Sequence, residues 1–483
     1  MADSLKQKTI KGVSWSFVEQ ILTRGVNFVI GIILARLLSP TDYGLVGMLG
    51  IFIAISQLFI DGGLANALIR QKEPSERDYS TVFIINFVLS VFFYFLLYFC
   101  APVIADFYEQ PLLKPLLRTI SLVLIISALS SVQNTILTIR VDFKKKTIIS
   151  IATSLISGAA GILCAYKGFG VWALVTQTLT AALTATLVTW VLVRWMPRLV
   201  FSGESFKRLF SFSSKLLASS MINTIYNNAY PLVIGKRFSA GDVGLFTRAG
   251  QFPNVLNDTL IGSFNRVAFP VLSRIQDDDQ RLIGIYEKYI QFFCFITFPC
   301  LMVLCGCSRP VVSFLLTDKW LDCVPFMQLM CFSLLPIGIV RINLNLLYVK
   351  GRSDLVLRME IIKKLIMFGV LFISMFFGLT AMCLGLILNS LIDMYFSSFY
   401  TKRILGYTLL QQLKSVFPYL LLSLLVLAES LLCSRFIPNN LLAILASLAA
   451  GFILYLFVAK VTGLYAYTEA MGLLRNIRGN NAT

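Results

Sequence analysis

The chain has 483 residues, of which 57% are hydrophobic and only 14% are charged. A soluble domain is about 45–50% apolar and about 25% charged, so the composition excludes a soluble protein, a disordered protein and a nucleic-acid-binding protein. The 42 Lys and Arg outnumber the 24 Asp and Glu and give a formal net charge of +18. Because the basic residues lie in short links between apolar runs, we interpret them as signals of membrane topology.

The sequence contains no histidine, which removes histidine general bases and histidine metal ligands. Its ten cysteines are scattered, mostly inside apolar runs, and no CxxC pair is present. We interpret them as small buried hydrophobic residues and predict no catalytic residues, no metal site and no bound cofactor. The polar, basic start precedes an apolar run far longer than a signal-peptide core, so we expect no cleavable signal.

Runs of apolar residues predict the membrane spans. A helix needs about 20 such residues to cross a bilayer, and fourteen runs of this kind are separated by Pro, Gly and charge clusters. In chain order they cover 12–38, 43–68, 81–105, 116–139, 147–166, 171–195, 209–235, 243–265, 285–306, 324–349, 361–378, 381–400, 415–434 and 441–462. The predicted fold class is an all-α polytopic membrane protein.

The distribution of Lys and Arg predicts the orientation. If the N-terminus is cytoplasmic, the inner links and tails hold thirty of them, the outer links nine and the spans three. Positive residues concentrate on the cytoplasmic side, so we expect both termini inside and an even number of spans. Every outer link is about 15 residues or shorter, too short to fold an extracytoplasmic domain.

An internal repeat appears at an offset of 200 residues. It covers the end of one span, a tight outer turn and the start of the next, and its serines and aspartates are expected to cap helices there. The matched positions are Asn27 with Asn227, Arg36 with Lys236, Ser39 with Ser239, and Asp42-Tyr43-Gly44-Leu45 with Asp242-Val243-Gly244-Leu245.

The repeat predicts how the chain is divided. Residues 1–200 and 201–408 form two lobes of six spans each, and residues 409–483 add two spans and a cytoplasmic tail. Because six is even, both lobes enter from the same side and are related by an axis along the membrane normal. Parallel repeats of this kind are a transporter architecture with the substrate site between the lobes.

Two stretches resemble a known family. NNAYPLVIGKRFSAGDVGLFTRAGQFPNVLNDTLIGSFNRVAFPVLSRIQDD (227–278) and KGVSWSFVEQILTRGVNFVIGIILARLLSPTDYGLVGM (11–48) resemble the polysaccharide exporters of the MOP flippase superfamily. The likeness extends to LIDMYFSSFYTKRILGY (391–407), covers about the first 410 residues, and looks most like the colanic-acid and lipopolysaccharide O-unit (Wzx-like) type.

The resemblance implies a flippase for undecaprenyl-diphosphate-linked oligosaccharide in the bacterial inner membrane. It also implies a V-shaped pair of six-helix lobes with a central cavity lined largely by spans 1, 2, 7 and 8. The implied partners are the lipid-linked oligosaccharide, membrane lipids and the polymerase or glycosyltransferase machinery, and not nucleic acid.

Polar residues inside the spans mark the candidate site, because an ionisable group at membrane depth indicates a pathway or a buried partner. Arg24 is the deepest, about 18–20 Å from either rim at 1.5 Å per residue. Gln20, Arg24 and Asn27 lie on one helix face. This face either lines a water-filled cavity or pairs with a carboxylate such as Glu429 or Asp393.

A second polar face lies on span 8, where Arg248, Gln251 and Asp258 recur at helical spacing and Pro253 is expected to kink the helix. Arg248 is close enough to the outer end that its side chain could instead extend to the membrane surface. For Arg341 and Asp393, binding and interhelix packing are equally compatible with the sequence. Asp61 is either a gate residue or a binding group, and Gly62-Gly63 is expected to end or bend its helix.

The intramembrane arginines suit an anionic cargo, because a diphosphate needs charge-assisted donors in place of its lost hydration. The predicted substrate-binding residues are Gln20, Arg24, Asn27, Asn223, Asn227, Arg248, Gln251 and Arg341. The predicted ion-coupling or gating residues are Asp61, Asp258 and Asp393.

No Walker motif is present, so the expected energy source is a cation gradient (H⁺ or Na⁺) or the membrane potential. Alternating access by a flippase is the main functional hypothesis. A cation-coupled drug antiporter of the same superfamily is the alternative, which would need an acidic cavity. A membrane polymerase or ligase is disfavoured because the outer links are short.

Overall fold

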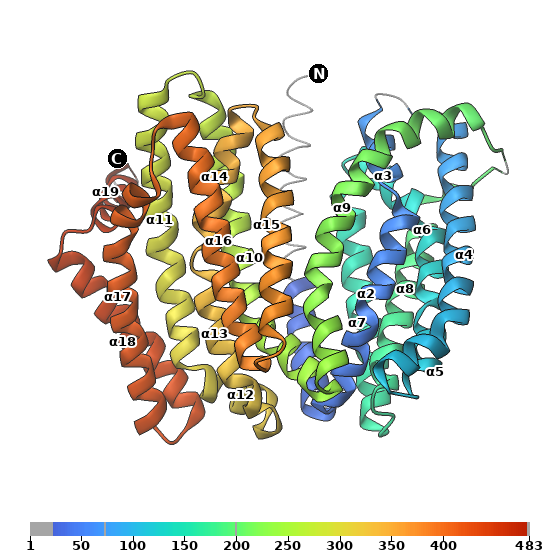
Figure 1. Cartoon of the computed structure of the whole chain (residues 1–483), viewed down its shortest axis with the longest axis horizontal. Coiled ribbons are helices and arrows are strands. Elements are labelled where there is room, and N and C mark those ends of the chain that lie inside the picture. Colours follow the sequence, from blue (N-terminus) through green and yellow to red (C-terminus); the bar gives the residue numbers. More distant parts are fainter. Residues whose placement is uncertain (1–22, 72–73, 199, 481–483) are drawn as a thin grey trace. The chain divides into compact units, whose positions relative to one another are not determined.

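The computed structural model describes residues 23–71, 74–198 and 200–480. Within these ranges every regular element is a helix (Figure 1). Ten of these helices or helix pairs are long and apolar enough to cross a membrane. The predicted fold class, an all-α polytopic membrane protein, is therefore confirmed.

The number of spans is not settled by these ten. Three further helices have the length to cross but are interrupted by polar and charged residues: α9 (Gly203–Arg237), α10 (Ala240–Arg274) and α15 (Ser353–Ser374). The first predicted span begins outside the described residues, although residues 23–37 are helical. The count of fourteen stays a prediction.

The chain forms two compact units, which we call the N-unit (Met1–Gly244) and the C-unit (Leu245–Thr483). Besides residues 23–37 and α9, the helices of the N-unit are α2 (Pro40–Asp61), α3 (Leu64–Arg70), α4 (Glu76–Tyr108), α5 (Leu113–Ile120), α6 (Leu122–Ile139), α7 (Phe143–Tyr166) and α8 (Trp172–Val193). Helix α9 belongs to this unit because it packs on α2, α3 and α4.

The packing boundary after Gly244 differs from the predicted lobe boundary near residue 200. The repeat is a similarity between two stretches of sequence, whereas the N-unit and the C-unit are defined by which helices pack together. The division into lobes of 1–200 and 201–408 therefore stays a prediction about the repeat.

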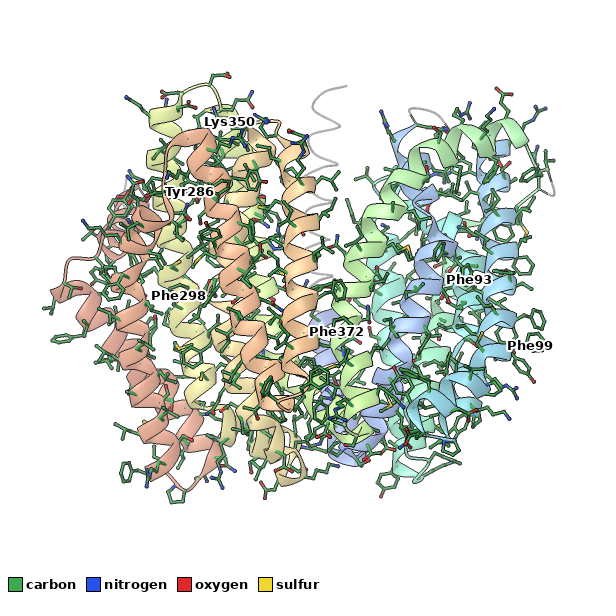
Figure 2. The ribbon with its side chains drawn as sticks, viewed as in Figure 1. Phe93, Phe99, Tyr286, Phe298, Lys350 and Phe372 are labelled. Atoms are coloured by element: carbon green, nitrogen blue, oxygen red, sulfur yellow. The ribbon has the colours of Figure 1, made fainter. Side chains whose placement is uncertain are left out.

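The C-unit contains most of α10 and all later helices. These are α11 (Asp279–Gly306), α12 (Ser308–Leu316), the 3-10 helix η1 (Asp318–Cys323), α13 (Val324–Leu334), α14 (Ile337–Val349), α15, α16 (Leu379–Leu405), α17 (Leu409–Phe436), α18 (Asn440–Val461) and α19 (Tyr465–Asn480). Its core centres on α11, where Tyr286 and Phe298 are buried (Figure 2).

The repeated turns have the same local structure. In the first, the Ser39 amide and hydroxyl donate to Asp42 Oδ2 at 2.8 and 2.6 Å, and the Asp42 amide donates to Ser39 Oγ at 3.2 Å. Ser239 and Asp242 make the same three bonds at 3.1, 2.7 and 3.1 Å. Each reciprocal pair satisfies helix N-terminal amides, so the predicted caps are confirmed.

Two repeat-related glycines allow the first turns of α2 and α10 to meet inside the N-unit. A Cβ on Gly44 would lie 1.6 Å from the carbonyl oxygen of Ala240, and a Cβ on Gly244 would lie 1.9 Å from that of Pro40. Both distances are far below a van der Waals contact. Gly44 and Gly244, and likewise Pro40 and Ala240, are 200 residues apart. The two repeated turns therefore contact each other through equivalent residues.

Candidate functional site

A polar cavity of about 670 Å³ lies inside the N-unit, between α2, α3, α6, α7, α8 and α9. At about 30 Å³ per water, it has room for roughly 20 molecules. Of the described side chains that line it, most are polar and none is aromatic. The polar ones are Gln57, Asp61, Asn66, Ser127, Ser130, Ser131, Asn134, Thr135, Thr138, Lys146, Ser150 and Ser220.

Helix α6 supplies half of this polar lining from a single face. Its hydroxyl groups donate to carbonyl oxygens of their own helix: Ser130 to Ser127 at 3.2 Å, Thr135 to Ser131 at 3.0 Å and Thr138 to Asn134 at 2.9 Å. Because the protons are used in this way, the oxygen lone pairs are what these side chains can offer to the cavity. Such a wall suits cations and hydrogen-bond donors.

Asp61 lies at the last position of α2, on the cavity wall. The helix ends there because Gly62 adopts a left-handed conformation with φ of 48°, which confirms the predicted stop. Gln57 Nε2 donates to Asp61 Oδ1 at 3.1 Å. No Lys or Arg nitrogen of the described residues lies within 4.0 Å of this carboxylate.

Lys146 is the basic residue among the described lining residues, and it was not among the predicted site residues. Its Nζ donates to Thr138 Oγ1 at 2.7 Å, one residue before the end of α6. Asn66 and Asn134 were missed as well. The signal for Asn134 was present, because Ser127, Ser131 and Asn134 follow helical spacing within the predicted fourth span.

The other predicted N-unit residues lie on helix surfaces rather than in this cavity. Arg24 and Asn27 are exposed on the helix of residues 23–37, and Asn223 and Asn227 are exposed on α9. Gln20 lies outside the described residues. The proposed role of these residues in substrate binding stays a prediction.

Arg248 lies in the C-unit in a setting that favours packing. Its side chain is buried, with 7% of the residue exposed, and its guanidinium lies 5.8 Å from the centre of the Trp320 ring. It also donates to Gln251 Oε1. A planar guanidinium over an aromatic face is a stabilising arrangement, so the side chain does not extend to the surface as one alternative held.

Asp393 has a specific cation partner. Lys363 Nζ, on α15, donates to Asp393 Oδ1 on α16 at 2.5 Å and to Glu360 Oε1 at 2.6 Å. Lys363 is 2% exposed, whereas the side chains of Glu360 and Asp393 are 31% and 25% exposed. Of the remaining predicted C-unit residues, Asp258 on α10 and Arg341 on α14 are both exposed.

The helix that contains the eleventh predicted span begins earlier than the span. The predicted span covers 361–378, whereas α15 runs over Ser353–Ser374. Lys363 and Lys364, which count toward the positive charge of the preceding inner link, lie within this helix. The first half of α15 carries many charged residues, which lowers its hydropathy. Two of them, Lys363 and Glu360, form an ion pair within the helix.

A second polar cluster is fully enclosed in the C-unit, and we call it the polar hub. Asn343 Nδ2 donates to Ser397 Oγ at 3.2 Å, Ser398 Oγ at 3.3 Å and Gln412 Oε1 at 3.2 Å. Its Oδ1 accepts bonds from Thr401 and Tyr286. Tyr286 lies toward the end of the C-unit that carries Lys350 (Figure 2).

An almost entirely apolar groove of about 460 Å³ lies elsewhere in the C-unit. Its walls come mainly from α11, α12, α17 and α18. Phe295, Val303, Val426, Leu448 and Phe452 are among the lining residues. The C-unit therefore offers an apolar surface at membrane depth in addition to its charged helices.

The sequence family described as "Polysaccharide biosynthesis protein" matches residues 33–325. The chain belongs to this family. It is 27% identical over 439 residues to "Lipopolysaccharide biosynthesis protein WzxC" of Escherichia coli (strain K12), with 88% of each chain covered. The resemblance to Wzx-like polysaccharide exporters is thus confirmed.

Solved structures show the fold of this polysaccharide biosynthesis protein. "Lipid II flippase MurJ, inward closed conformation" matches with a TM-score of 0.76 and 16% identity, over 94% of this chain and 98% of that one. A "multidrug resistance MATE family transporter of the MOP superfamily" matches with a TM-score of 0.65 and 15% identity, over 80% and 94%. The chain therefore has the fold that those two solved structures share.

Proposed function

We propose that this protein translocates undecaprenyl-diphosphate-linked oligosaccharide from the cytoplasmic to the outer leaflet for polysaccharide biosynthesis, by alternating access. The observation that carries the proposal is the match of residues 33–325 to the polysaccharide biosynthesis family, together with near full-length similarity to WzxC. Intramembrane arginines supply donors for the diphosphate.

The two units offer different environments for the parts of such a substrate. The hydroxyl- and amide-lined N-unit cavity is wet and polar, which suits a solvated sugar or an ion. The apolar groove of the C-unit suits a segment of a polyisoprenyl tail. We place the protein in the bacterial inner membrane with both termini cytoplasmic, on the strength of the Lys and Arg bias.

Arg24→Ala tests the proposal. We expect the variant to insert and fold but to lose translocation of a fluorescent lipid-linked oligosaccharide in proteoliposomes, because one intramembrane donor for the diphosphate is gone. Arg36→Ala, on the same helix but near its outer end, is the matched control and is expected to retain transport. Normal translocation by Arg24→Ala at a normal protein level would assign Arg24 to structure.

Asp61 is our candidate for ion coupling, because its carboxylate lies on the wall of the N-unit cavity and accepts a bond from a single amide, that of Gln57. We expect Asp61→Asn to abolish the dependence of translocation on an imposed H⁺ or Na⁺ gradient while the folded protein remains intact. Ser150→Ala, on the same cavity wall, is the control. Unchanged gradient dependence in Asp61→Asn would exclude this role.

The antiporter alternative would need a cavity dominated by acidic groups. Among the described residues that line the N-unit cavity, Asp61 is the one carboxylate and Lys146 the one ammonium, so these two formal charges balance. Export of an organic cation that survives Arg24→Ala would favour the antiporter. Association with a polymerase or glycosyltransferases is a further proposal, which co-purification from a polysaccharide-producing cell would test.

A further inference from the structure

The link between α8 and α9 continues into the first turns of α9, and we call residues 194–198 and 200–210 the α8–α9 segment. Helix α8 is long and apolar enough to cross a membrane, and it ends at Val193. The segment therefore begins where the chain leaves the hydrocarbon. Figure 1 shows the first turns of α9 lying across the end of the N-unit at which α4 begins. The α8–α9 segment thus lies at one rim of the membrane-spanning part of the N-unit.

The segment is tied to the start of α4. Four hydrogen bonds run from it to the first six residues of that helix: Trp195 Nε1 to Glu76 Oε2 at 3.0 Å, the Arg198 amide to Ser80 Oγ at 3.2 Å, the Ser202 amide to Thr81 Oγ1 at 3.0 Å, and Arg208 Nη2 to Asp78 Oδ1 at 2.7 Å. The Trp195 ring also packs edge-on against Tyr79 and Phe83. Two backbone amides, one indole and one guanidinium therefore fix the segment on the N-unit.

Three cations of the segment take no part in these bonds through their side chains. Arg194, Arg198 and Lys207 are exposed, and no carboxylate of the described residues lies within 4.0 Å of their charged nitrogens. Glu204 is the one acidic residue of the segment. The segment therefore presents a surplus of positive charge at the membrane rim, which favours anionic partners.

An apolar ridge of three phenylalanine rings lies on the same segment. The ring centres of Phe201 and Phe206 are 6.5 Å apart, and those of Phe206 and Phe210 are 5.3 Å apart. Phe201 and Phe210 are 56% and 45% exposed, whereas Leu209, on another side of the helix, is buried among residues of α3, α4 and α6. Exposed aromatic side chains together with basic residues are typical of a helix in the interface between water and lipid.

We propose that the α8–α9 segment is a binding surface for anionic phospholipids, with Arg194, Arg198 and Lys207 on the headgroup phosphates and the phenylalanine ridge against the acyl chains. The occupant follows from position and charge, because the anion that meets an apolar phase at a membrane rim is a lipid headgroup. The Lys and Arg bias assigns this end of the N-unit to the cytoplasm. The inference goes beyond the proposed function and does not depend on the cargo.

The first test compares binding of fluorescent phosphatidylglycerol and phosphatidylcholine to the full chain in detergent, by anisotropy. Arg198→Gln with Lys207→Gln is the informative double variant, because the amide at position 198 can still bond to Ser80. Each cation near an anionic lipid surface contributes about 1 kcal/mol, so we expect phosphatidylglycerol to bind the double variant about thirtyfold more weakly and phosphatidylcholine to bind as before. Equal affinity of the unmodified protein for both lipids, or unchanged affinity in the double variant, would overturn the proposal.

The matched control removes the same charge from the other end of the N-unit. Lys114→Gln with Lys167→Gln neutralises two exposed lysines there, and we expect phosphatidylglycerol binding to stay at the unmodified level. A further variant, Arg198→Lys with Lys207→Arg, keeps both charges and should keep the affinity. A loss in the control would mean that the lipid follows the net charge of the chain, and a loss in the charge-retaining variant would mean that charge is not what the lipid recognises. Either result would overturn the proposal.

Salt dependence is the last check. Raising the ionic strength from 0.1 to 1 M shortens the Debye length from about 10 to about 3 Å, so we expect the preference for phosphatidylglycerol to fade in the unmodified protein. A preference that does not depend on salt would assign lipid selection to the ridge and contradict the role of the cations. An acidic protein is the other class of partner for such a surface. If both lipids bind alike while polymer export in cells requires Arg198 and Lys207, that partner is favoured and the lipid surface is wrong.

Discussion

The N-unit cavity and the C-unit polar hub are built from the same residue types but differ in what they do with them. In the cavity, the side chains of α6 face open space large enough for water. In the hub, Asn343 of α14 binds its neighbours from α11, α16 and α17 through both ends of its amide. One region is hollow, and in the other the polar groups bond directly to one another.

The difference depends on α17, a helix of the segment that follows the two predicted lobes. Gln412 of α17 places its Oε1 where it accepts bonds from Asn343 at 3.2 Å and Ser398 at 2.9 Å. It is buried, with 1% of the residue exposed. The additional helix therefore closes a polar interior in the C-unit, while the corresponding polar face of α6 stays open to the cavity.

The largest effect that this comparison predicts is the loss of the hub. Asn343→Leu keeps the size of the side chain but removes the acceptor of the enclosed Tyr286 hydroxyl and the donor to Ser397, Ser398 and Gln412. A buried polar group left unsatisfied costs about 1–3 kcal/mol. We expect the free energy of unfolding to fall by about 3 kcal/mol, measured as loss of the folded fraction with denaturant in detergent. A loss below about 1 kcal/mol would mean that water enters the hub, and the contrast with the cavity would disappear.

A smaller loss is expected at the helix that closes the hub. Gln412→Leu removes an acceptor from Asn343 and Ser398, but it also removes Gln412 Nε2, which is buried without a partner among the described residues. The two consequences offset each other in part. We expect a fall in the free energy of unfolding of about 1–2 kcal/mol. Lys414→Leu, two residues later and exposed, is the control.

A result at Gln412 as large as that at Asn343 would contradict this view. It would mean that α17 holds the C-unit together through this amide rather than merely closing a polar interior. A thermal-stability series in detergent for the three variants, at matched protein concentration, would separate these cases.

The sequence predicted well what depends on local chemistry. Ser39 with Asp42 and Ser239 with Asp242 form the expected caps because a serine three residues before an aspartate needs no distant partner. Gly62 ends α2 as expected because only its own backbone conformation is involved. Long apolar runs predicted the helices for the same reason.

The sequence could not predict partners that come from distant helices. Asp393 was a candidate for coupling or binding, and nothing near it in the chain indicates that Lys363, thirty residues earlier, neutralises it. Lys363 itself lies at the start of the predicted span 361–378, and the span does not indicate that its charge is enclosed inside the C-unit. The hub and the cavity show the same limit, since Asn134 and Asn343 occupy similar polar runs and only tertiary packing separates them.

The smallest effect, expected at Asn134, is also the sharpest control for the comparison. Asn134→Ala removes an amide from the cavity wall, where water can occupy the space and bind the groups left behind. We therefore expect the free energy of unfolding to change by about 0.5 kcal/mol or less, in the range of ordinary surface substitutions. If the loss instead approached that of Asn343→Leu, the N-unit cavity would be closed in the folded protein, and a hydrated path to Asp61 would have no physical basis.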